Sequence, residues 1–236
     1  MVADFAFPLI FIGILGTSLQ AWFGNQAGGL NLLDYVFTGV LAQTVWQSSA
    51  LGLISLLADR EQDFSQEIFV SPISRYSIIL GKILGESLVA LPQALGIIAF
   101  GFILQIHMAP DQLARMALAM LVIALFGGAF GVIVLANLSS QRAANQIFPF
   151  VMLPQFFLAG VFNPIGRLPW YLDIVSHISP MRYAIDFLRD VYYGFLPEAV
   201  PVALYSAPVN LAVMGVMFVL FLGIGTTLFV RSERNR

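Results

Sequence analysis

Long uninterrupted apolar runs alternate with short polar connections along this chain. A helix that crosses the roughly 30 Å hydrocarbon layer of a bilayer needs about 20 apolar residues, because it rises about 1.5 Å per residue. The pattern predicts an all-α membrane protein in which residues 1–236 form a single transmembrane domain. Six runs approach the required length, the fifth being the shortest: Phe5–Phe23, Tyr35–Leu57, Ile78–Leu104, Ala114–Leu138, Ile147–Phe162 and Pro208–Val230.

The composition agrees with this class. Hydrophobic residues make up 59% of the chain and charged residues only 10%, against roughly a quarter in ordinary globular domains. The net charge of −2 gives no reason to expect a nucleic-acid partner. The chain has no cysteine, and His107 and His177 have no second histidine at ligand spacing, so no metal site is expected.

Lysine and arginine in the short connections predict the orientation, because cytoplasmic loops of membrane proteins carry an excess of both. Counting spans from the first, one side carries Arg60, Arg75, Lys82, Arg142, Arg231, Arg234 and Arg236. The other side carries Arg115, Arg167, Arg182 and Arg189. We therefore expect the first side, with both termini, to be cytoplasmic.

A polar island separates the second and third spans, at residues 58–77. The stretch from Asp59 to Arg75, both included, contains six charged residues. The segment from Glu67 to Val70 can form a short helix with an apolar side, which stops where Pro72 biases Ser71 away from helical geometry. An island of this kind lies in water or against another protein. We expect a helix that docks onto a cytoplasmic partner, and the alternative is a simple linker.

The long connection at residues 163–207 is not an ordinary loop. Its pattern predicts two short amphipathic helices, the first starting near Pro169 and the second at Pro180 with Ser179 as its cap. We expect both to dip into or lie along the outer leaflet, and the alternative is a soluble outer cap. Five aromatic residues suit the headgroup zone, where rings with one polar end collect: Trp170, Tyr171, Tyr183, Tyr192 and Tyr193.

Polar residues also occur within the predicted spans. Gln43 and Gln47 share one helix face, as do Lys82 and Glu86, and Gln93 roughly continues the second stripe. A charged side chain at the bilayer centre costs about 2.5–3.5 kcal/mol on insertion scales, so such residues face a partner or a wet cavity. We expect hydrogen bonds between helices here, with substrate contact as the alternative.

Two glycine pairs have the spacing that allows helices to approach closely. Gly81 and Gly85 lie in the third predicted span, and Gly127 and Gly131 lie in the fourth. Small residues four apart form a flat strip on one helix face. We expect both pairs to serve helix packing.

Several segments together resemble one family. The island residues Asp59–Glu61 and Glu67–Arg75, followed by Ile78–Lys82, resemble the cytoplasmic signature of type-two ABC exporter permeases, which include daunorubicin-resistance and polysaccharide exporters. Leu153–Phe162 resembles the fifth span of that family. Ser179–Arg189 is similar to its outer motif N-P-x-x-Y-A-x-D-x-x-R, with Ser179 where asparagine is commoner and Arg182 where a small polar residue is usual.

The resemblance implies a six-span permease in the plasma membrane, the inner membrane of a bacterium. It would work as a homodimer, with each copy docked to a separate ABC ATPase subunit that binds ATP and Mg. This chain would carry no catalytic residue. The implied coupling residues are Asp59, Arg60, Glu61, Glu67, Ile68, Phe69, Ser71, Pro72 and Arg75. The implied outer re-entrant residues are Pro169, Trp170, Pro180, Tyr183, Asp186 and Arg189.

The sequence indicates the chemical class of the substrate but not its identity. Phenylalanine-rich spans and short loops leave little room for a soluble binding domain, so we expect an ATP-driven exporter of an amphipathic or lipid-linked molecule. Members of the family begin with a cytoplasmic amphipathic helix, whereas Phe5–Phe11 already has the composition of a span. We therefore expect a shorter start than the family pattern.

Two other classes of function remain as alternatives. An ATP-independent secondary transporter would show inverted repeats and matched Gly or Pro breaks in the two halves; Pro92 has no obvious counterpart. An intramembrane protease or acyltransferase would need a nucleophile or paired carboxylates, and the sequence contains neither G-x-S-x-G nor two carboxylates in one span. A glycine-rich phosphate-binding loop is also missing, so ATP chemistry is expected on another chain.

Overall fold

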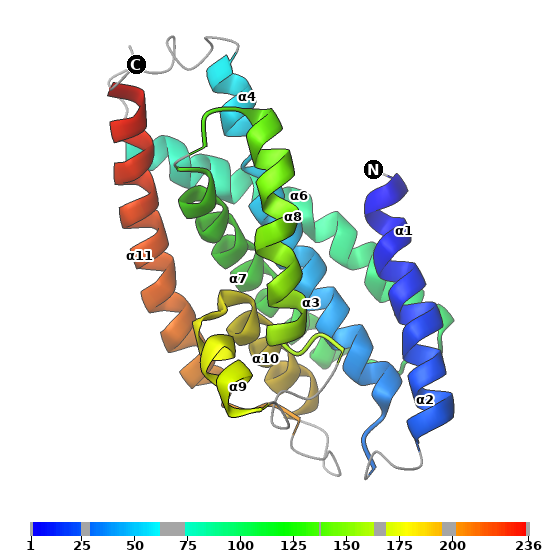
Figure 1. Ribbon diagram of the computed structural model, residues 1–236. Helices are drawn as coiled ribbons and strands as arrows, with labels where there is room; N and C mark the ends of the chain where they lie inside the picture. The colour runs from blue at the N-terminus through cyan, green and yellow to red at the C-terminus, as the bar shows by residue number, and fades with distance from the viewer. Residues whose placement is uncertain are drawn as a thin grey trace.

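The computed structural model describes residues 2–24, 29–61, 74–136, 138–162, 169–194 and 202–234, and these are helical apart from short connections. In chain order the helices run as Figure 1 shows: α1 (Val2–Ile10), η1 (Phe11–Gly16), α2 (Thr17–Phe23), α3 (Leu32–Gly52), α4 (Ser55–Glu61), α6 (Arg75–Ile103), α7 (Pro110–Leu135), α8 (Gln141–Leu158), α9 (Trp170–Ile178), α10 (Pro180–Tyr193) and α11 (Ala207–Arg234). The predicted all-α class is confirmed for these residues.

Five stretches of the described residues are long and apolar enough to cross a membrane. They are Ala6–Phe23, Leu32–Ala58, Arg75–Ile103, Pro110–Leu135 and Ala207–Phe229. They correspond to the predicted first, second, third, fourth and sixth spans. The predicted fifth span lies in α8, which starts at Gln141 instead of Ile147 and has 18 residues. Its first two turns contain polar residues and make it less apolar than the others, so the six-span count stays a prediction.

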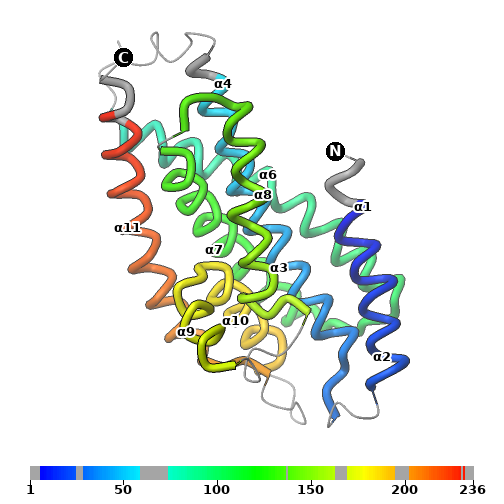
Figure 2. The backbone as a smooth tube through the Cα atoms, viewed as in Figure 1, coloured from blue at the N-terminus to red at the C-terminus, as the bar shows by residue number. Residues whose placement is uncertain are grey.

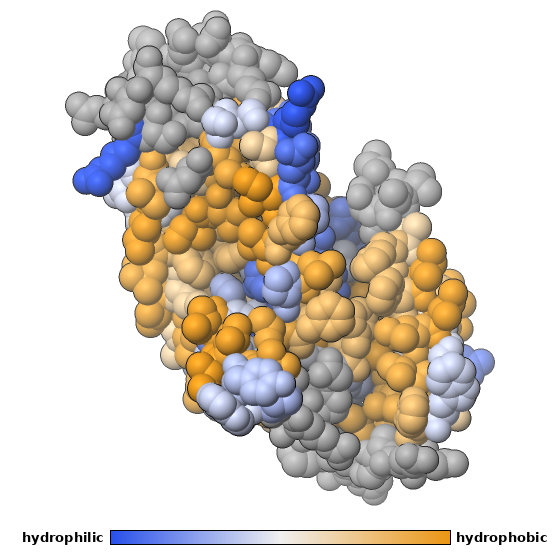
Figure 3. Space-filling model, in the orientation of Figure 1, coloured by the Kyte–Doolittle hydropathy of each residue, from blue (hydrophilic) through white to orange (hydrophobic). Residues whose placement is uncertain are grey.

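α3 occupies the centre of the molecule. It packs against α6, α7 and α10, and the residues from Tyr35 to Trp46 are all buried. α11 lies on one flank, and α1 with α2 lies on the other, as the backbone trace in Figure 2 shows. Hydrophobic surface covers both flanks in Figure 3, with hydrophilic residues between them. A central helix buried on all sides and flanking helices with apolar outer faces are what a membrane bundle requires.

The two glycine pairs behave differently. A Cβ atom on Gly127 would overlap the carbonyl oxygen of Trp46, and one on Gly131 would lie 2.6 Å from that of Ala50. α7 and α3 therefore touch backbone to backbone, as predicted. In contrast, a Cβ on Gly81 or Gly85 would meet no described atom within 4 Å. The packing prediction is wrong for this pair within the described chain, because that face of α6 points outward.

The ends of the helices separate into two groups. α4, the first turn of α6 and the C-terminal end of α11 lie at one end of the bundle, toward which the start of α1 also points (Figure 1). α9 and α10 lie at the opposite end. This agrees with the predicted grouping of the island and both termini on one side and the 163–207 segment on the other.

The orientation of these two ends can be tested with single cysteines, because the chain has none of its own. Ser139, between α7 and α8, and Ser206, before α11, are both exposed and lie at opposite ends. An impermeant maleimide added to intact cells is expected to label Ser206→Cys and to leave Ser139→Cys unlabelled until the membrane is permeabilised. The reverse pattern would invert the assigned topology.

Candidate functional site

Four of the predicted coupling residues belong to the two helices that flank the island. Asp59, Arg60 and Glu61 form the end of α4, and Arg75 is the first residue of α6. The described parts of the island, up to Glu61 and from Arg75, are therefore helical. Five further predicted residues lie outside the described residues: Glu67, Ile68, Phe69, Ser71 and Pro72. Their coupling role stays a prediction.

Lys82 and Glu86 form the ion pair that their spacing predicted. The Nζ atom of Lys82 lies 3.4 Å from Oε1 of Glu86. The same oxygen is 3.4 Å from the hydroxyl of Ser55, which belongs to α4, so the pair also links two helices. Gln93 lies about two turns further along α6 and is half-buried, outside this cluster.

Gln43 and Gln47 pair with each other on α3. The Nε2 atom of Gln43 donates to Oε1 of Gln47 at 3.2 Å, so the predicted shared face is confirmed. The bond joins residues of one helix and not two helices as expected. Oε1 of Gln43 is buried and has no hydrogen-bond partner among the described residues. A buried amide oxygen without a donor is costly, so this position has capacity for a further polar contact.

α10 is more deeply buried than the sequence indicated. Three of its charged residues are at most 3% exposed, namely Arg182, Asp186 and Arg189. Charged side chains are rarely buried without partners. Each of the three contacts a different part of the chain, so α10 is the centre of a polar network at the end of the bundle opposite α4.

Arg189 ties α10 to α3 and to the end of α8. Its Nη2 atom donates to the carbonyl oxygens of Tyr35, at 3.2 Å, and Val161, at 3.3 Å. Its guanidinium carbon lies 3.6 Å from the centre of the Tyr35 ring. The Tyr35 hydroxyl donates to the Gly160 carbonyl at 3.1 Å, and the positive φ of 73° at Gly160 is a conformation that favours glycine. We call these contacts the Arg189 latch.

Asp186 and Asp190 tie α10 to the start of α11. The Asp186 carboxylate accepts hydrogen bonds from the backbone of Leu204 and Tyr205 and from the Asn210 side chain, at 2.7–2.9 Å. Oδ2 of Asp190 accepts from the backbone N–H of Ala207 at 2.6 Å. Carboxylates are stabilised by the free N–H groups and the positive dipole end at a helix N-terminus.

Arg182 ties α10 to α9. Its Nη1 atom lies 3.3 Å from the Asp173 carboxylate and 3.2 Å from Nδ1 of His177, and it also contacts the Ser176 hydroxyl. Its guanidinium carbon lies 5.9 Å from the centre of the Tyr205 ring. The polar side of α9 thus faces the protein. Its other side is exposed and apolar, with Trp170 77% and Ile178 71% exposed.

Two details of the predicted outer helices need correction. Ser179 precedes Pro180 as expected, but its hydroxyl donates to Oε1 of Gln155 at 3.4 Å and does not cap α10. Tyr183, Tyr192 and Tyr193 are buried within the chain, so their rings do not face lipid as expected. They face the core because α10 packs between α3, α7 and α11. Trp170 and Tyr171 are exposed, as predicted.

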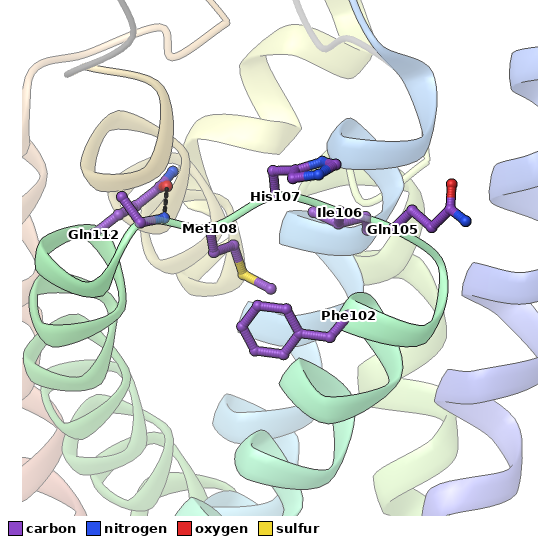
Figure 4. Close-up of a pocket in the computed structure, with 7 residues that line it drawn as sticks. Phe102, Gln105, Ile106, His107, Met108 and Gln112 are labelled. Carbon is purple, nitrogen blue, oxygen red and sulfur yellow. Dashed lines mark hydrogen bonds between the residues drawn. The ribbon is translucent and has the colours of Figure 1, made fainter.

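An apolar cavity of about 640 Å³ lies beside this network, at the connection between α6 and α7. In Figure 4 the side chains of Phe102 and Met108 point toward each other across it. Gln112 accepts from the Ala109 N–H at 3.3 Å and donates to the carbonyl of Tyr192 at 2.9 Å. Burial raises the pKa of the Tyr192 hydroxyl, and the nearby Asp34 carboxylate raises it further, so this phenol stays neutral.

Several residues of the network were not singled out from the sequence. Tyr35 and Asn210 lie at the ends of apolar runs, where a polar residue looks like an ordinary boundary, and Asp190 lies in the polar part of the 163–207 connection. Ser55 and Gly52, which contact Glu86 at the other end of the bundle, also escaped notice because they lie inside the second predicted span and carry no charge. One sequence feature could have indicated the network. Asn210 is the third residue of a predicted span, where a side-chain amide needs a hydrogen-bond partner.

Comparison with known proteins gives a family match over most of the chain. The model of the family described as ABC-2 type transporter matches residues 1–193. A protein of Cyanophora paradoxa described as a transport permease, ycf38, is 28% identical over 188 residues, which cover 78% of this chain and 65% of the relative.

Two further relatives have related descriptions. A probable multidrug ABC transporter permease of Escherichia coli, YbhR, is 30% identical over 141 residues, 59% of this chain and 38% of the relative. Nodulation protein J of Rhizobium meliloti is 24% identical over 200 residues, 82% of this chain and 74% of the relative. The matched part thus spans less than two thirds of the length of the first two relatives.

Proposed function

This chain belongs to the ABC-2 type transporter family, and from that premise we propose that it is the permease subunit of an ATP-driven exporter. It is a multi-pass membrane protein, and we place it in a bacterial inner membrane. The observation that carries the proposal is the family match over residues 1–193, a range that contains both the polar island and α10. The proposed cargo is an amphipathic or lipid-linked molecule moved out of the cytoplasm.

A separate ABC ATPase would dock on the polar island. The last residues of α4 and the first residues of α6 lie at the same end of the bundle. A partner bound there would therefore act on the second and third spans together. ATP and Mg would bind to that partner. Ile68 and Phe69 would enter a cleft of the ATPase, with Glu67 and Arg75 as polar contacts at its rim.

Two copies of the chain would form the working unit. Each copy has one island, whereas a transporter with two ATPase subunits needs two docking sites. The first and fifth predicted spans have apolar faces that no described helix covers: Ile14 is 65% exposed on η1, and Phe150 is 80% exposed on α8. We propose that these faces and the outer short helices form the dimer contact.

The Arg189 latch would act as the outer gate. It joins α3, the end of α8 and α10, and so closes the space between them at the end opposite α4. Gly39 lies against Val161 and Arg189, and Gln43 and Gln47 follow it on the same face of α3 at steps of four residues. The two amides therefore lie one and two turns further along α3 than the latch, in the direction of α4. A substrate with polar groups would contact them there.

Replacing Phe69 with alanine is expected to uncouple the two subunits. Burying a large apolar side chain is worth roughly 1.5–3 kcal/mol, whereas an exposed ion pair gives about 0–1 kcal/mol. Phe69→Ala should therefore lower the affinity for the ATPase by roughly 10- to 100-fold, and Arg75→Ala by much less. The measurement is the amount of ATPase that co-purifies with the tagged chain from native membranes.

The same preparations test transport in proteoliposomes. ATP-dependent movement of NBD-labelled phosphatidylethanolamine, an amphipathic probe, should fall with Phe69→Ala while the chain remains in the membrane at its normal level. Wild-type ATPase association and probe movement in both Phe69→Ala and Glu67→Lys would refute the coupling role. Purification of a transport-competent chain without any ATPase polypeptide would refute the proposed function as a whole.

A further inference from the structure

The second membrane-spanning helix is interrupted just before the chain enters the island. Between α3 and α4 the N–H of Ile54 donates to Leu51 at 2.9 Å, and the N–H of Leu56 donates to Leu53 at 3.0 Å. These are i→i−3 bonds in place of the i→i−4 bonds of an α-helix. The Gly52 carbonyl accepts instead from the Ser55 hydroxyl. A short stretch of i→i−3 bonding inside a helix often marks a hinge.

Glu86 of α6 fills the notch at this interruption. Its Oε1 lies 3.4 Å from the Ser55 hydroxyl and 3.4 Å from Nζ of Lys82. Its other oxygen lies in the space that a side chain at position 52 would need, so that a Cβ there would overlap the carboxylate. The side chain is only 18% exposed. Glu86 thus contacts both sides of the α3–α4 interruption.

We propose that Glu86 is a positioning residue that clamps the α3–α4 interruption, so that the island moves as one unit with both of its flanking spans. α4 leads into the island and α6 leads out of it, and the carboxylate joins the two. With the clamp in place, a displacement of the island shifts α3 and α6 together. Without it, α4 swings at the interruption and the displacement is lost. This inference rests on the proposed coupling to an ATPase.

The clamp is not explained by stability alone. Lys82 precedes Glu86, which is the less favourable order for an i, i+4 pair on a helix, and the pair is partly exposed. Such pairs contribute little to folding. The contact with the notch is the specific feature, because it requires glycine at position 52 and an acceptor at position 86.

Two substitutions remove the clamp in different ways. Gly52→Ala pushes the carboxylate out of the notch; the three described atoms nearest to the new Cβ all belong to the flexible side chain of Glu86 and none to the backbone, so the fold is retained. Glu86→Ala removes the carboxylate itself. Gly85→Ala is the matched control, since a Cβ there meets no described atom within 4 Å. The double variant Gly52→Ala/Glu86→Ala should be no worse than either single variant, because both act on one contact.

The first measurement is hydrogen exchange by mass spectrometry on the purified complex. Both single variants should exchange the amides of residues 53–58 at least about 5-fold faster than the wild type, the lower end of the range for coupled sites. Gly85→Ala should match the wild type. Unchanged exchange in Glu86→Ala would overturn the clamp.

The second measurement is the ratio of probe movement to ATP hydrolysis, with NBD-labelled phosphatidylethanolamine as the probe. A merely structural defect lowers both quantities and leaves the ratio unchanged, whereas loss of the clamp should lower the ratio at least about 5-fold. Faster exchange with an unchanged ratio would overturn the role in coupling. A wild-type complex that hydrolyses no ATP would instead overturn the proposed function, and the coupling role with it.

Discussion

Arg189→Ala is expected to destabilise the protein more than any other single charge removal outside the island. The side chain is 2% exposed and holds two carbonyl oxygens and one aromatic ring. A buried polar group that loses its partner costs about 1–3 kcal/mol, and a desolvated cation–π contact is worth about 2 kcal/mol. The free energy of unfolding should therefore fall by about 3–5 kcal/mol. The measurement is the melting temperature of the detergent-solubilised protein.

Two variants act as controls for Arg189→Ala. Arg189→Lys keeps the charge but lacks the planar fork that reaches two acceptors, so it should lie between the wild type and Arg189→Ala. Arg115→Ala removes an ion pair with Asp111 in which the two side chains are 31% and 68% exposed, so it should lower the melting temperature much less than Arg189→Ala. At about 2–4 °C per kcal/mol for a chain of this size, the Arg189→Ala decrease should exceed roughly 5 °C. Equal melting temperatures for Arg189→Ala and Arg115→Ala would contradict the latch.

Gly127→Ala and Gly81→Ala are expected to have effects of opposite sign. At position 127 the new methyl group overlaps the carbonyl of Trp46, so α3 and α7 must separate. Overpacking of this kind costs about 1–3 kcal/mol or more. At position 81 the methyl group meets no described atom within 4 Å. There the better helix propensity of alanine should stabilise the protein by up to about 1 kcal/mol.

The two glycine variants can be compared in the same melting experiment. Both replace a helical glycine by alanine within a pair of the same spacing, so differences in helix propensity cancel. Gly131→Ala should resemble Gly127→Ala, because its methyl group would lie 2.6 Å from the Ala50 carbonyl oxygen. If all of these variants melted at the same temperature, the close contact of α3 with α7 would be wrong.

The spans were predictable because each depends on a local property, the length of an apolar run. Phe5–Phe23 and Pro208–Val230 were found within a few residues of the observed stretches. α8 was harder to delimit, since polar residues such as Arg142 and Asn145 belong to the same helix. Hydropathy averages over a window and therefore cuts a helix where its composition changes, and not where its hydrogen bonds end.

The burial of α10 could not be predicted in the same way. Arg182, Asp186 and Arg189 resemble the polar face of a surface helix when only neighbours in sequence are considered. Their burial depends on partners far along the chain, such as Tyr35 for Arg189 and Asn210 for Asp186. The equal spacing of the two glycine pairs likewise carries no information on which helix each pair faces.

The contacts between α10 and the start of α11 have a consequence for biogenesis. The buried Asp186 carboxylate accepts hydrogen bonds from Leu204, Tyr205 and Asn210. All three residues are synthesised after Asp186. Before Leu204 is synthesised the carboxylate has none of these donors, and the set is complete only with Asn210. A buried charge without partners is strongly disfavoured. α10 must therefore stay in contact with water while the earlier spans assemble. The end of the bundle that holds α9 and α10 therefore closes last, when the final helix enters the membrane.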